Sequence, residues 1–230
     1  MKEKQILKDL KTSFEQKANP VNAKEQKRYM KSRLDFWGIK TLELNQLAKS
    51  VFRNYSLESA QEYRKILLYL FENASKREEW YAAIQFALFF KAFIKEENLS
   101  VWVKMIRLAG WWDITDSITG KLIGPTLKDN EKMTTYARKW IEDENFWIRR
   151  TALLMQLKYK TKTDFELLKE LILKTKHEDE LFIQKAIGWA LRQYSYYNPE
   201  VVLKFVSESE LSRLSKREAL KVIERKKLRN

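Results

Sequence analysis

Apolar residues recur at intervals of three and four positions along nearly the whole chain, and this spacing predicts amphipathic α-helices. The first predicted helix covers residues 4–16, with Leu10 and Phe14 on its apolar face, and Asn19-Pro20 follows it as a break. Further helices are predicted over residues 23–31, from a cap at Thr41 through Phe52, from a cap at Ser56 to about Asn73, and over residues 76–94. Only five glycines and three prolines occur among the 230 residues, which favours an all-helical protein.

A unit of two helices then repeats along the chain. Four aromatic residues each open an apolar helix, at separations of 32, 35 and 35 residues: Trp80, Trp112, Trp147 and Phe182. The same step forwards from Phe182 reaches a helix over residues 217–223, and partner helices are predicted between these units, for example over residues 165–173 and 201–206. A two-helix repeat of this length is typical of α-solenoids of the HEAT or a related type. We therefore predict an all-α fold with one domain over residues 1–230, curved so that stacked inner helices form a concave binding face.

The charge balance favours a polyanionic partner. Lys and Arg number 45 against 31 Asp and Glu, which gives a net charge of +14 and a pI near 9.7. Nucleic acid is the commonest partner of such a chain, although a lysine-rich composition can also serve solubility alone. Eight tryptophans and ten tyrosines exceed what packing in a domain of this size needs, so we expect some of them to face a ligand.

Several classes of site are excluded by composition. The chain has no cysteine and one histidine, His177, which lies in a polar segment predicted to be a loop. A disulfide framework, a thiolate zinc site, a histidine metal cage and a Ser-His-Asp triad are therefore ruled out. The N-terminus lacks the apolar core of a signal peptide, and no apolar segment approaches 18 residues. We expect a soluble cytoplasmic protein that does not enter a membrane.

The segment Gly110–Ser117 is the strongest candidate for chemistry, because it places two adjacent tryptophans beside two aspartates where a helix should begin. Trp112 and Asp116 stand four residues apart on that helix, so an indole and a carboxylate share one face, about 6 Å apart at Cβ. An indole face attracts cations, and a fixed carboxylate stabilises positive charge that develops in a transition state. The structural alternative is that the tryptophans belong to the core and that an aspartate caps the helix.

Counting from the aromatic residue that opens each repeat, the candidate residues fall on one helical face across three successive repeats. They are Trp112 and Asp116, then Arg150 and Lys158, then Trp189 and Arg192. Arginines suit such a face because the planar guanidinium binds phosphate through two hydrogen bonds. The alternatives are a solvated face for the arginines and a core position for Trp189. Gly188, beside Trp189, predicts a close backbone approach.

The chain resembles the AlkD family of bacterial DNA alkylation repair glycosylases over nearly its whole length. The order and spacing of several short segments carry the likeness: Lys-Arg-Tyr-Met-Lys at 27–31, Gly-Ile-Lys-Thr at 38–41, Trp-Trp-Asp-Ile-Thr-Asp-Ser at 111–117, Trp-Ile-Arg-Arg-Thr-Ala at 147–152, Gln-Leu-Lys-Tyr-Lys at 156–160, Phe-Ile-Gln-Lys-Ala-Ile-Gly-Trp-Ala-Leu-Arg at 182–192 and Leu-Ser-Lys-Arg-Glu-Ala at 214–219.

The resemblance implies an enzyme of base excision repair that hydrolyses the N-glycosidic bond of positively charged N3- and N7-alkylpurines, such as 3-methyladenine and 7-methylguanine. Members of the family are single-domain HEAT-like solenoids that act on duplex DNA without a metal or an organic cofactor, and they leave the lesion stacked in the duplex. The resemblance thus implies a monofunctional, monomeric DNA glycosylase in the bacterial cytoplasm, associated with the nucleoid when it is bound to DNA. Lys158 and Lys185 are the lysines that a lyase activity would need.

Site residues follow from the match to the family's motifs. The resemblance implies that Asp116 is the catalytic carboxylate and that Trp112 and Trp189 contact the damaged nucleotide. Asp113 also matches a family position, and we interpret it as a cap or a structural residue. The chemistry agrees, because loss of an alkylated purine leaves a neutral base and an oxocarbenium-like sugar. A carboxylate and indole faces both stabilise such positive charge.

Contacts to the DNA backbone are implied for further positions. Arg150 and Arg192 would hold phosphates around the lesion, with Lys158 on the same face, while Tyr29 approaches from the N-terminal side. Thr41, at a predicted helix N-terminus, suits a phosphate or sugar contact.

The chain departs from the family's pattern after Thr41, where Leu42 replaces a common proline, and this puts contacts to the undamaged strand in doubt. Two other functions stay open. A non-catalytic HEAT-like module for damaged or branched DNA needs the basic face but not Asp116, and a protein-binding solenoid would take an acidic peptide.

Overall fold

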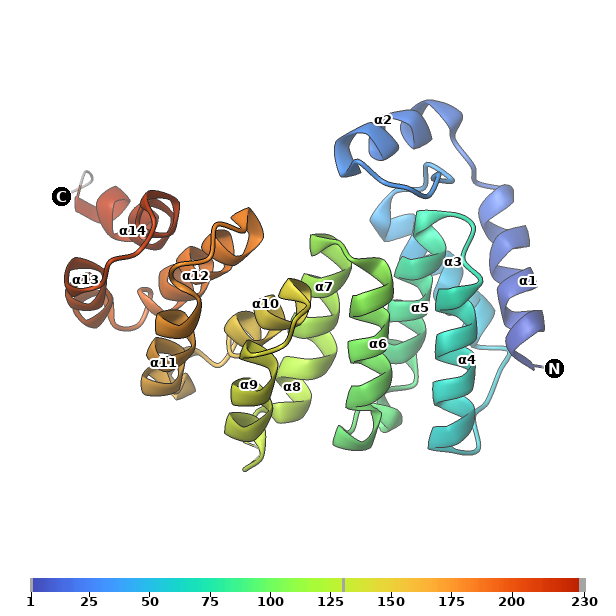
Figure 1. Ribbon diagram of the computed structural model, residues 1–230. Helices are drawn as coiled ribbons and strands as arrows, with labels where there is room; N and C mark the ends of the chain where they lie inside the picture. The colour runs from blue at the N-terminus through green and yellow to red at the C-terminus, as the bar shows by residue number, and fades with distance from the viewer. Residues whose placement is uncertain (1, 130, 228–230) are drawn as a thin grey trace. The chain divides into compact units, whose positions relative to one another are not determined.

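The computed structural model describes residues 2–129 and 131–227, and these residues form an all-helical protein (Figure 1). The predicted all-α class is confirmed. Contacts between Cα atoms divide the chain into two compact units, Met1–Leu108 and Ala109–Asn230, which we call unit 1 and unit 2. The single domain over residues 1–230 and its concave face stay predictions.

Unit 1 contains helices and two short 3₁₀ turns. The α-helices are α1 (Lys2–Glu15), α2 (Pro20–Met30), α3 (Thr41–Phe52), α4 (Ala60–Glu72), α5 (Arg77–Phe89) and α6 (Leu99–Ala109), and the 3₁₀ turns are Lys91–Phe93 and Glu96–Asn98. Helix α1 packs on α3 and α4, and both of these pack on α5. Their core includes Phe52 and Tyr63, whose rings lie 5.4 Å and 6.0 Å from that of Phe86.

Two predicted helix caps in unit 1 are wrong. Thr41 is the first residue of α3 rather than its cap, and Lys40 before it makes no side-chain capping hydrogen bond. Ser59, not Ser56, caps α4, because its side chain accepts from the backbone N–H of Glu62. Both serines satisfy the local preference for a hydroxyl at a helix start, and the chain stays irregular for three residues beyond the first of them. The helix predicted over residues 76–94 also ends earlier, at Phe89.

The irregular segment between α2 and α3 is held by one buried carboxylate. Glu78 of α5 accepts hydrogen bonds from the backbone N–H groups of Trp37, Gly38 and Ile39, at 3.0, 2.8 and 3.2 Å. Gly38 has φ +84°, and a Cβ there would lie 2.0 Å from the carbonyl oxygen of Asn19. Only glycine therefore fits this position, and the start of α3 is fixed against the rest of unit 1.

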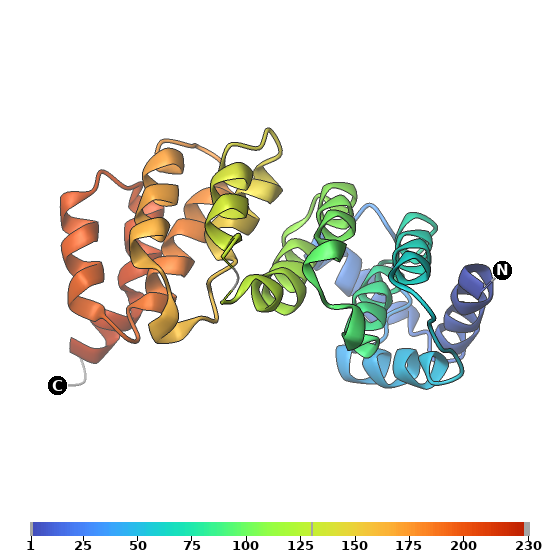
Figure 2. The ribbon, with the colours of Figure 1, turned by 90° about the horizontal axis from the view of Figure 1, so that it is seen from below.

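Unit 2 is a stack of helices in two layers. Its elements are α7 (Trp112–Ile118), a π-helical turn (Thr119–Ile123), α8 (Gly124–Leu127), α9 (Met133–Ile141), α10 (Phe146–Leu154), a 3₁₀ turn (Lys160–Lys162), α11 (Phe165–Thr175), α12 (Leu181–Tyr194), α13 (Pro199–Glu208) and α14 (Arg213–Lys227). In one layer α7, α10, α12 and α14 pack in succession, and in the other α9 packs on α11 (Figures 1 and 2). Pairs such as α9 with α10 and α13 with α14 form the arrangement of a helical-repeat fold.

The close backbone approach predicted at Gly188 is confirmed, and its partner is α14. A Cβ on Gly188 would lie 2.4 Å from the Cβ of Glu218 and 2.9 Å from the carbonyl oxygen of Ser215. The missing side chain therefore allows α12 and α14 to pack in contact. His177 lies in the turn after α11, as predicted. Among the described residues, no helix combines the length and the apolar character needed to cross a membrane.

Candidate active site on unit 2

The site is built around the start of α7. Gly110 has φ +55°, a conformation that glycine adopts without strain, and the chain turns there into the helix. Trp112 is the first residue of α7, and buried Ile114 and Ile118 fix the helix in unit 2. Asp116 therefore lies on the helix face opposite to this packing, one turn after Trp112.

Asp116 is held by Arg150 of α10 through both of its oxygens. The guanidinium Nε donates to Oδ1 and Nη2 donates to Oδ2, each at 2.8 Å. The third nitrogen, Nη1, donates to the backbone carbonyl of Phe182 in α12. Both side chains are enclosed, with 5 % of Arg150 and 15 % of Asp116 exposed. One ion pair thus links three successive helices of the stack.

Burial raises the pKa of Asp116 above its ordinary value of 3.8. The hydrogen bonds and positive charge of Arg150 oppose this shift, and the negative charge of Asp113 adds to it. The physical cause is the loss of water around the carboxylate, which penalises its charged form. Asp116 is therefore poised to take a proton more readily than an ordinary aspartate does.

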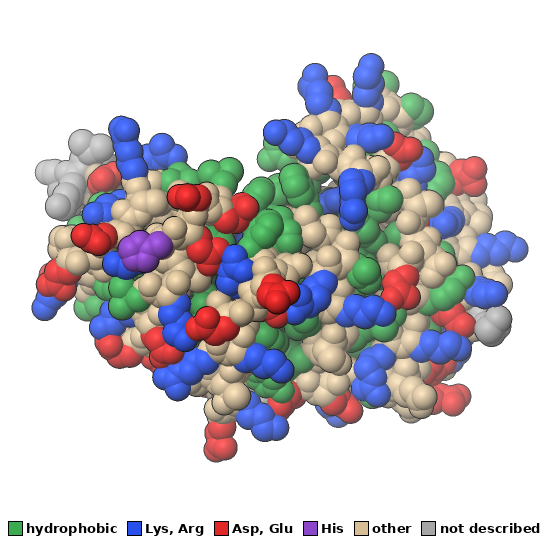
Figure 3. Space-filling view, in the orientation of Figure 1, with side chains coloured by type: hydrophobic (Ala, Val, Ile, Leu, Met, Phe, Trp, Pro, Cys, Tyr) green, Lys and Arg blue, Asp and Glu red, His purple; other side chains and the backbone are tan. Residues whose placement is uncertain are grey.

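An aromatic cluster surrounds this pair. The ring of Phe182 lies 4.9 Å from that of Trp147 and 5.8 Å from that of Trp111. The guanidinium of Arg150 and the ammonium of Lys185 each lie 6.0 Å from the Phe182 ring. In the space-filling view, hydrophobic side chains gather over the ends of α10 and α12 (Figure 3). The apolar rings lower the local dielectric and strengthen the field of the ion pair.

Trp112 and Trp189 differ from the tryptophans of that cluster. Both are half-buried, and among residues 2–129 and 131–227 neither ring stacks on another aromatic ring. Buried core tryptophans such as Trp80 and Trp102 instead donate an indole hydrogen bond within the protein. The two indoles are therefore partly accessible, and their contact with a ligand stays a prediction.

Arg192 of α12 is also paired. Its Nη1 lies 2.6 Å from the Glu218 carboxylate of α14, and Lys221 binds the other oxygen of that carboxylate. Burial raises the pKa of Glu218, but the hydrogen bonds from Lys221 and Arg192 outweigh it and hold the pKa below its ordinary value. Arg192 is therefore already ion-paired within the protein. Lys221, which binds the same carboxylate, would still neutralise Glu218 if Arg192 moved away.

Lys158 lies elsewhere than predicted. The prediction counted Lys158 as the position eleven residues after Trp147 and so assumed a longer helix. Helix α10 ends at Leu154, however, and Lys158 follows in a turn. Its ammonium instead lies near the π-helical turn, 3.9 Å from the point that a Cβ on Gly120 would occupy.

The comparisons with known proteins now bear on this geometry. The sequence profile described as DNA alkylation repair enzyme matches residues 10–223. The chain belongs to the DNA alkylation repair enzyme family. A solved structure from Enterococcus faecalis, described as a predicted DNA alkylation repair enzyme, is 35 % identical, with a TM-score of 0.76 over 89 % of this chain and 95 % of that one. A comparison with curated proteins finds no match.

The two site residues predicted in unit 1 both lie at exposed positions. Tyr29 is 78 % exposed on α2, and Thr41 is exposed at the start of α3. Lysine and arginine side chains gather over α2 in Figure 3, and the sequence of this helix contains Lys24, Lys27 and Arg28. These features suit a contact with a phosphate backbone.

Phe182 and Trp111 are functional candidates to which the sequence analysis gave no site role, although Phe182 opens a repeat and Trp111 lies in the candidate segment. Phe182 contributes both a ring beneath Arg150 and the carbonyl that accepts from it. Its alignment with Trp112 and Trp147 as a repeat-opening aromatic was the signal that could have identified it. The indole N–H of Trp111 is buried and finds no hydrogen-bond acceptor among the described residues.

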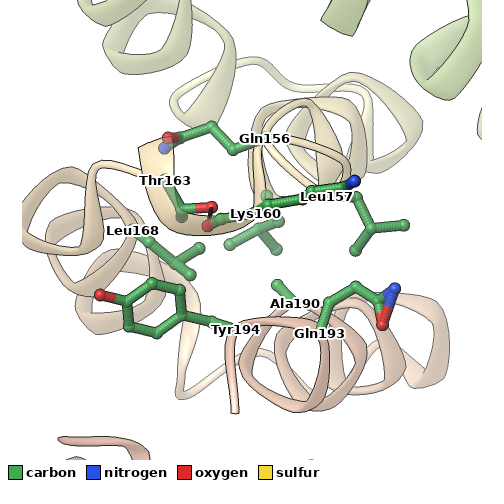
Figure 4. Close-up of a pocket in the computed structure, with 9 residues that line it drawn as sticks. Gln156, Leu157, Lys160, Thr163, Leu168, Ala190, Gln193 and Tyr194 are labelled. Atoms are coloured by element: carbon green, nitrogen blue, oxygen red, sulfur yellow. Dashed lines mark hydrogen bonds between the residues drawn. The ribbon is translucent and has the colours of Figure 1, made fainter. Parts of the chain in front are cut away.

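A cavity in the same unit offers no alternative site for a base. It lies between the end of α10, α11 and α12 and has a volume of about 10 Å³ (Figure 4). Gln193 and Tyr194 line it from α12. This space is about that of one water molecule, far below the volume of a purine. Within residues 2–129 and 131–227, no three acidic or histidine side chains lie close enough to hold a metal ion.

Proposed function

We propose that this protein is a DNA glycosylase that hydrolyses the N-glycosidic bond of positively charged N3- and N7-alkylpurines in duplex DNA. The observation that carries the proposal is the Asp116 carboxylate, bound through both oxygens by Arg150 on the same unit as two half-exposed indoles. Its family supplies the general role, which is repair of alkylated DNA. The substrate class in this proposal comes from the charge that the site stabilises.

The reaction breaks the bond between the purine nitrogen and C1′ of the deoxyribose. The bonding electrons pass to the cationic purine, which leaves as a neutral base, and the sugar becomes an oxocarbenium-like cation. Water then adds to C1′ and loses a proton. In this mechanism Asp116 stabilises the sugar cation, orients the water and accepts its proton, while no general acid is required for so good a leaving group.

Arg150 positions this carboxylate. Its three nitrogens donate within the protein and only 5 % of its side chain is exposed, so it is a poor partner for a phosphate. We therefore replace the phosphate contact expected from the sequence with a positioning role: Arg150 fixes the orientation of Asp116 and favours its ionised form.

The remaining predicted residues keep their proposed roles. Trp112 and Trp189 place indole faces against the cationic nucleotide, where each contributes a cation–π attraction. Arg192 binds a backbone phosphate by leaving Glu218, which Lys221 continues to neutralise. In this proposal Tyr29 and Thr41 contact the backbone from unit 1.

We further propose that the lesion stays stacked in the duplex and that the enzyme acts as a monomer without a metal or organic cofactor. An open site of half-exposed side chains accommodates adducts that a closed pocket would exclude. Recognition then depends on positive charge rather than on the hydrogen-bonding edge of a flipped base, so bulky cationic adducts should be substrates.

The deciding experiment is single-turnover release of 7-methylguanine from a defined duplex. Asp116→Asn should abolish release at matched DNA occupancy, whereas Glu166→Gln, on an α11 side chain that is 81 % exposed, should release the base at the wild-type rate. If the wild type binds the duplex but releases neither 7-methylguanine nor 3-methyladenine, the protein is instead a non-catalytic module for damaged or branched DNA.

A further inference from the structure

Unit 2 contains both paired and unpaired cations, and three of the unpaired lysines lie in or near the π-helical turn. Many of these cations pair with a carboxylate on a neighbouring helix, for example Arg138 with Glu170 at 2.8 Å. By contrast, the side chains of Lys121, Lys128 and Lys158 form no ion pair or hydrogen bond with the part of the chain that the structure describes. All three residues are exposed.

The fold brings these lysines to one place. Gly120 lies in the π-helical turn. Because it has no side chain, the Lys158 side chain can pass beside it, and the Lys158 Cε lies 3.8 Å from the point that a Cβ on Gly120 would occupy. The turn that carries Lys158 is itself anchored, because the hydroxyl of Tyr159 donates to the backbone carbonyl of Gly124 at 2.8 Å. A π-helical turn inside a helix is a common mark of a functional segment.

The lysines border an open pocket of about 210 Å³. Lys128 and Lys158 both line it, together with the apolar side chains of Pro125 and Met155. Lys121 lies next to Gly120 in the π-helical turn. Partial burial of its ammonium and the nearby positive charge of Lys158 both lower its pKa. Two or three ammonium groups that form no ion pair within the described residues repel one another, and an anion would relieve that repulsion.

We propose that Lys121, Lys128 and Lys158 form a binding site for consecutive backbone phosphates of the DNA strand beyond the lesion. This proposal rests on the proposed function, in which DNA is the substrate. It adds Lys121, Lys128 and the pocket to the DNA contact already expected of Lys158. Lys121 follows Asp116 by five residues within the helical segment that runs from α7 through α8, and Lys128 follows Asp116 by twelve residues, directly after the end of α8 at Leu127, so they lie about 7.5 Å and about 18 Å along its axis. One strand of a duplex advances about 3.4 Å per phosphate, so this spacing fits several nucleotides rather than one small anion.

Salt dependence of DNA affinity tests the site directly. Each neutralised phosphate contributes about 0.9 to the slope of log K against log salt concentration. For an undamaged duplex, we expect the double variant Lys121→Gln, Lys128→Gln to lose roughly two such contributions, and Lys158→Gln to lose one. Lys139→Gln is the matched control, because Lys139 is exposed on α9 and forms no ion pair within the described residues.

Two further measurements separate the proposal from its alternatives. The double variant Lys121→Arg, Lys128→Arg should restore the wild-type slope, which mere misfolding would not do. Inorganic phosphate at constant ionic strength should not displace the duplex. A wild-type slope in the double glutamine variant, an equal loss in Lys139→Gln, or displacement by inorganic phosphate would overturn the site.

The site and the glycosylase activity fail in different experiments. If the wild type releases no alkylated base but the glutamine variants lose their slope, the phosphate site stands and the proposed reaction is wrong. If base release depends on Asp116 while the slopes are unchanged, the reaction stands and the phosphate site is wrong.

Discussion

Arg150 binds both carboxylate oxygens of Asp116 at 2.8 Å, and the two residues come from helices 34 positions apart in the chain. A bidentate arginine fixes the rotation of a carboxylate as well as its position. Because the pair is enclosed, the charge of Asp116 is retained by one guanidinium rather than by water. This arrangement leaves a carboxylate whose two oxygens are both hydrogen-bonded within the protein.

Removal of the guanidinium should therefore damage stability and activity together. Arg150→Ala leaves a buried carboxylate without its partner, and breaking a buried ion pair in this way costs about 3–5 kcal/mol of unfolding free energy. Urea unfolding measures this loss. Arg150→Lys keeps the charge but not the two parallel hydrogen bonds, so we expect a folded protein with slower base release at saturating enzyme. Equal release by Arg150→Lys and wild type would show that the bidentate geometry is unimportant.

The pKa of Asp116 predicts a pH dependence of the reaction. In the proposed mechanism Asp116 acts as a carboxylate, so release should slow as the pH falls through its pKa, which burial raises above the ordinary value of 3.8. Arg150 lowers the pKa, so its replacement by glutamine should move the acid limb of the rate profile to higher pH. Single-turnover rates, corrected for uncatalysed depurination, give both midpoints. A midpoint in Arg150→Gln at or below that of the wild type would contradict this.

The same shift has a consequence for stability. A carboxyl group whose pKa is raised on folding binds more protons in the native state between its ordinary and its native pKa. The wild type should therefore lose unfolding free energy from this group as the pH rises through that interval. Asp116→Asn lacks the titration, so the difference between the two unfolding free energies should change with pH only there.

The two half-exposed tryptophans should affect the rate through positive charge. Trp112→Leu and Trp189→Leu each remove a cation–π attraction of about 0.5–2 kcal/mol, which corresponds to roughly 2- to 30-fold slower release. Tyr196→Leu, on an exposed residue after α12, is the control for loss of an aromatic ring from the surface. Unchanged release in both tryptophan variants would assign the two indoles to packing.

Much of the fold could be predicted from the sequence because amphipathic spacing sets which face of each helix is buried. The repeat of aromatic residues also placed Asp116 and Arg150 on equivalent faces of adjacent repeats. What spacing could not predict was the outcome of their meeting. Two charged residues on one face can bind a ligand separately or bind each other, and only the distance between helices decides which occurs.

Local signals explain the other errors. Nothing between Met155 and Lys158 breaks a helix, since this segment has no glycine or proline, yet α10 ends at Leu154. The π-helical turn at Thr119–Ile123 contains Gly120 and precedes Gly124-Pro125, but these residues do not distinguish a π-turn from an α-helix, since the two differ by one hydrogen-bond step. The lysine pocket depends on both features, so it could be found only in three dimensions.

The contact between α12 and α14 gives a test of the packing that supports Trp189 and Arg192. In an ordinary helix, Gly→Ala raises stability by about 1 kcal/mol through helix propensity. At Gly188 the new Cβ would approach the Ser215 carbonyl to 2.9 Å, and backbone cannot move aside as a flexible side chain can. Overpacking of this kind costs about 1–3 kcal/mol, so Gly188→Ala should be destabilising overall. Gly120→Ala, whose nearest contact is a lysine methylene at 3.8 Å, should be neutral or stabilising. If thermal unfolding shows the two variants to be equally stable, α14 can shift away from α12 without cost, and the pairing of Arg192 with Glu218 is not fixed by this contact.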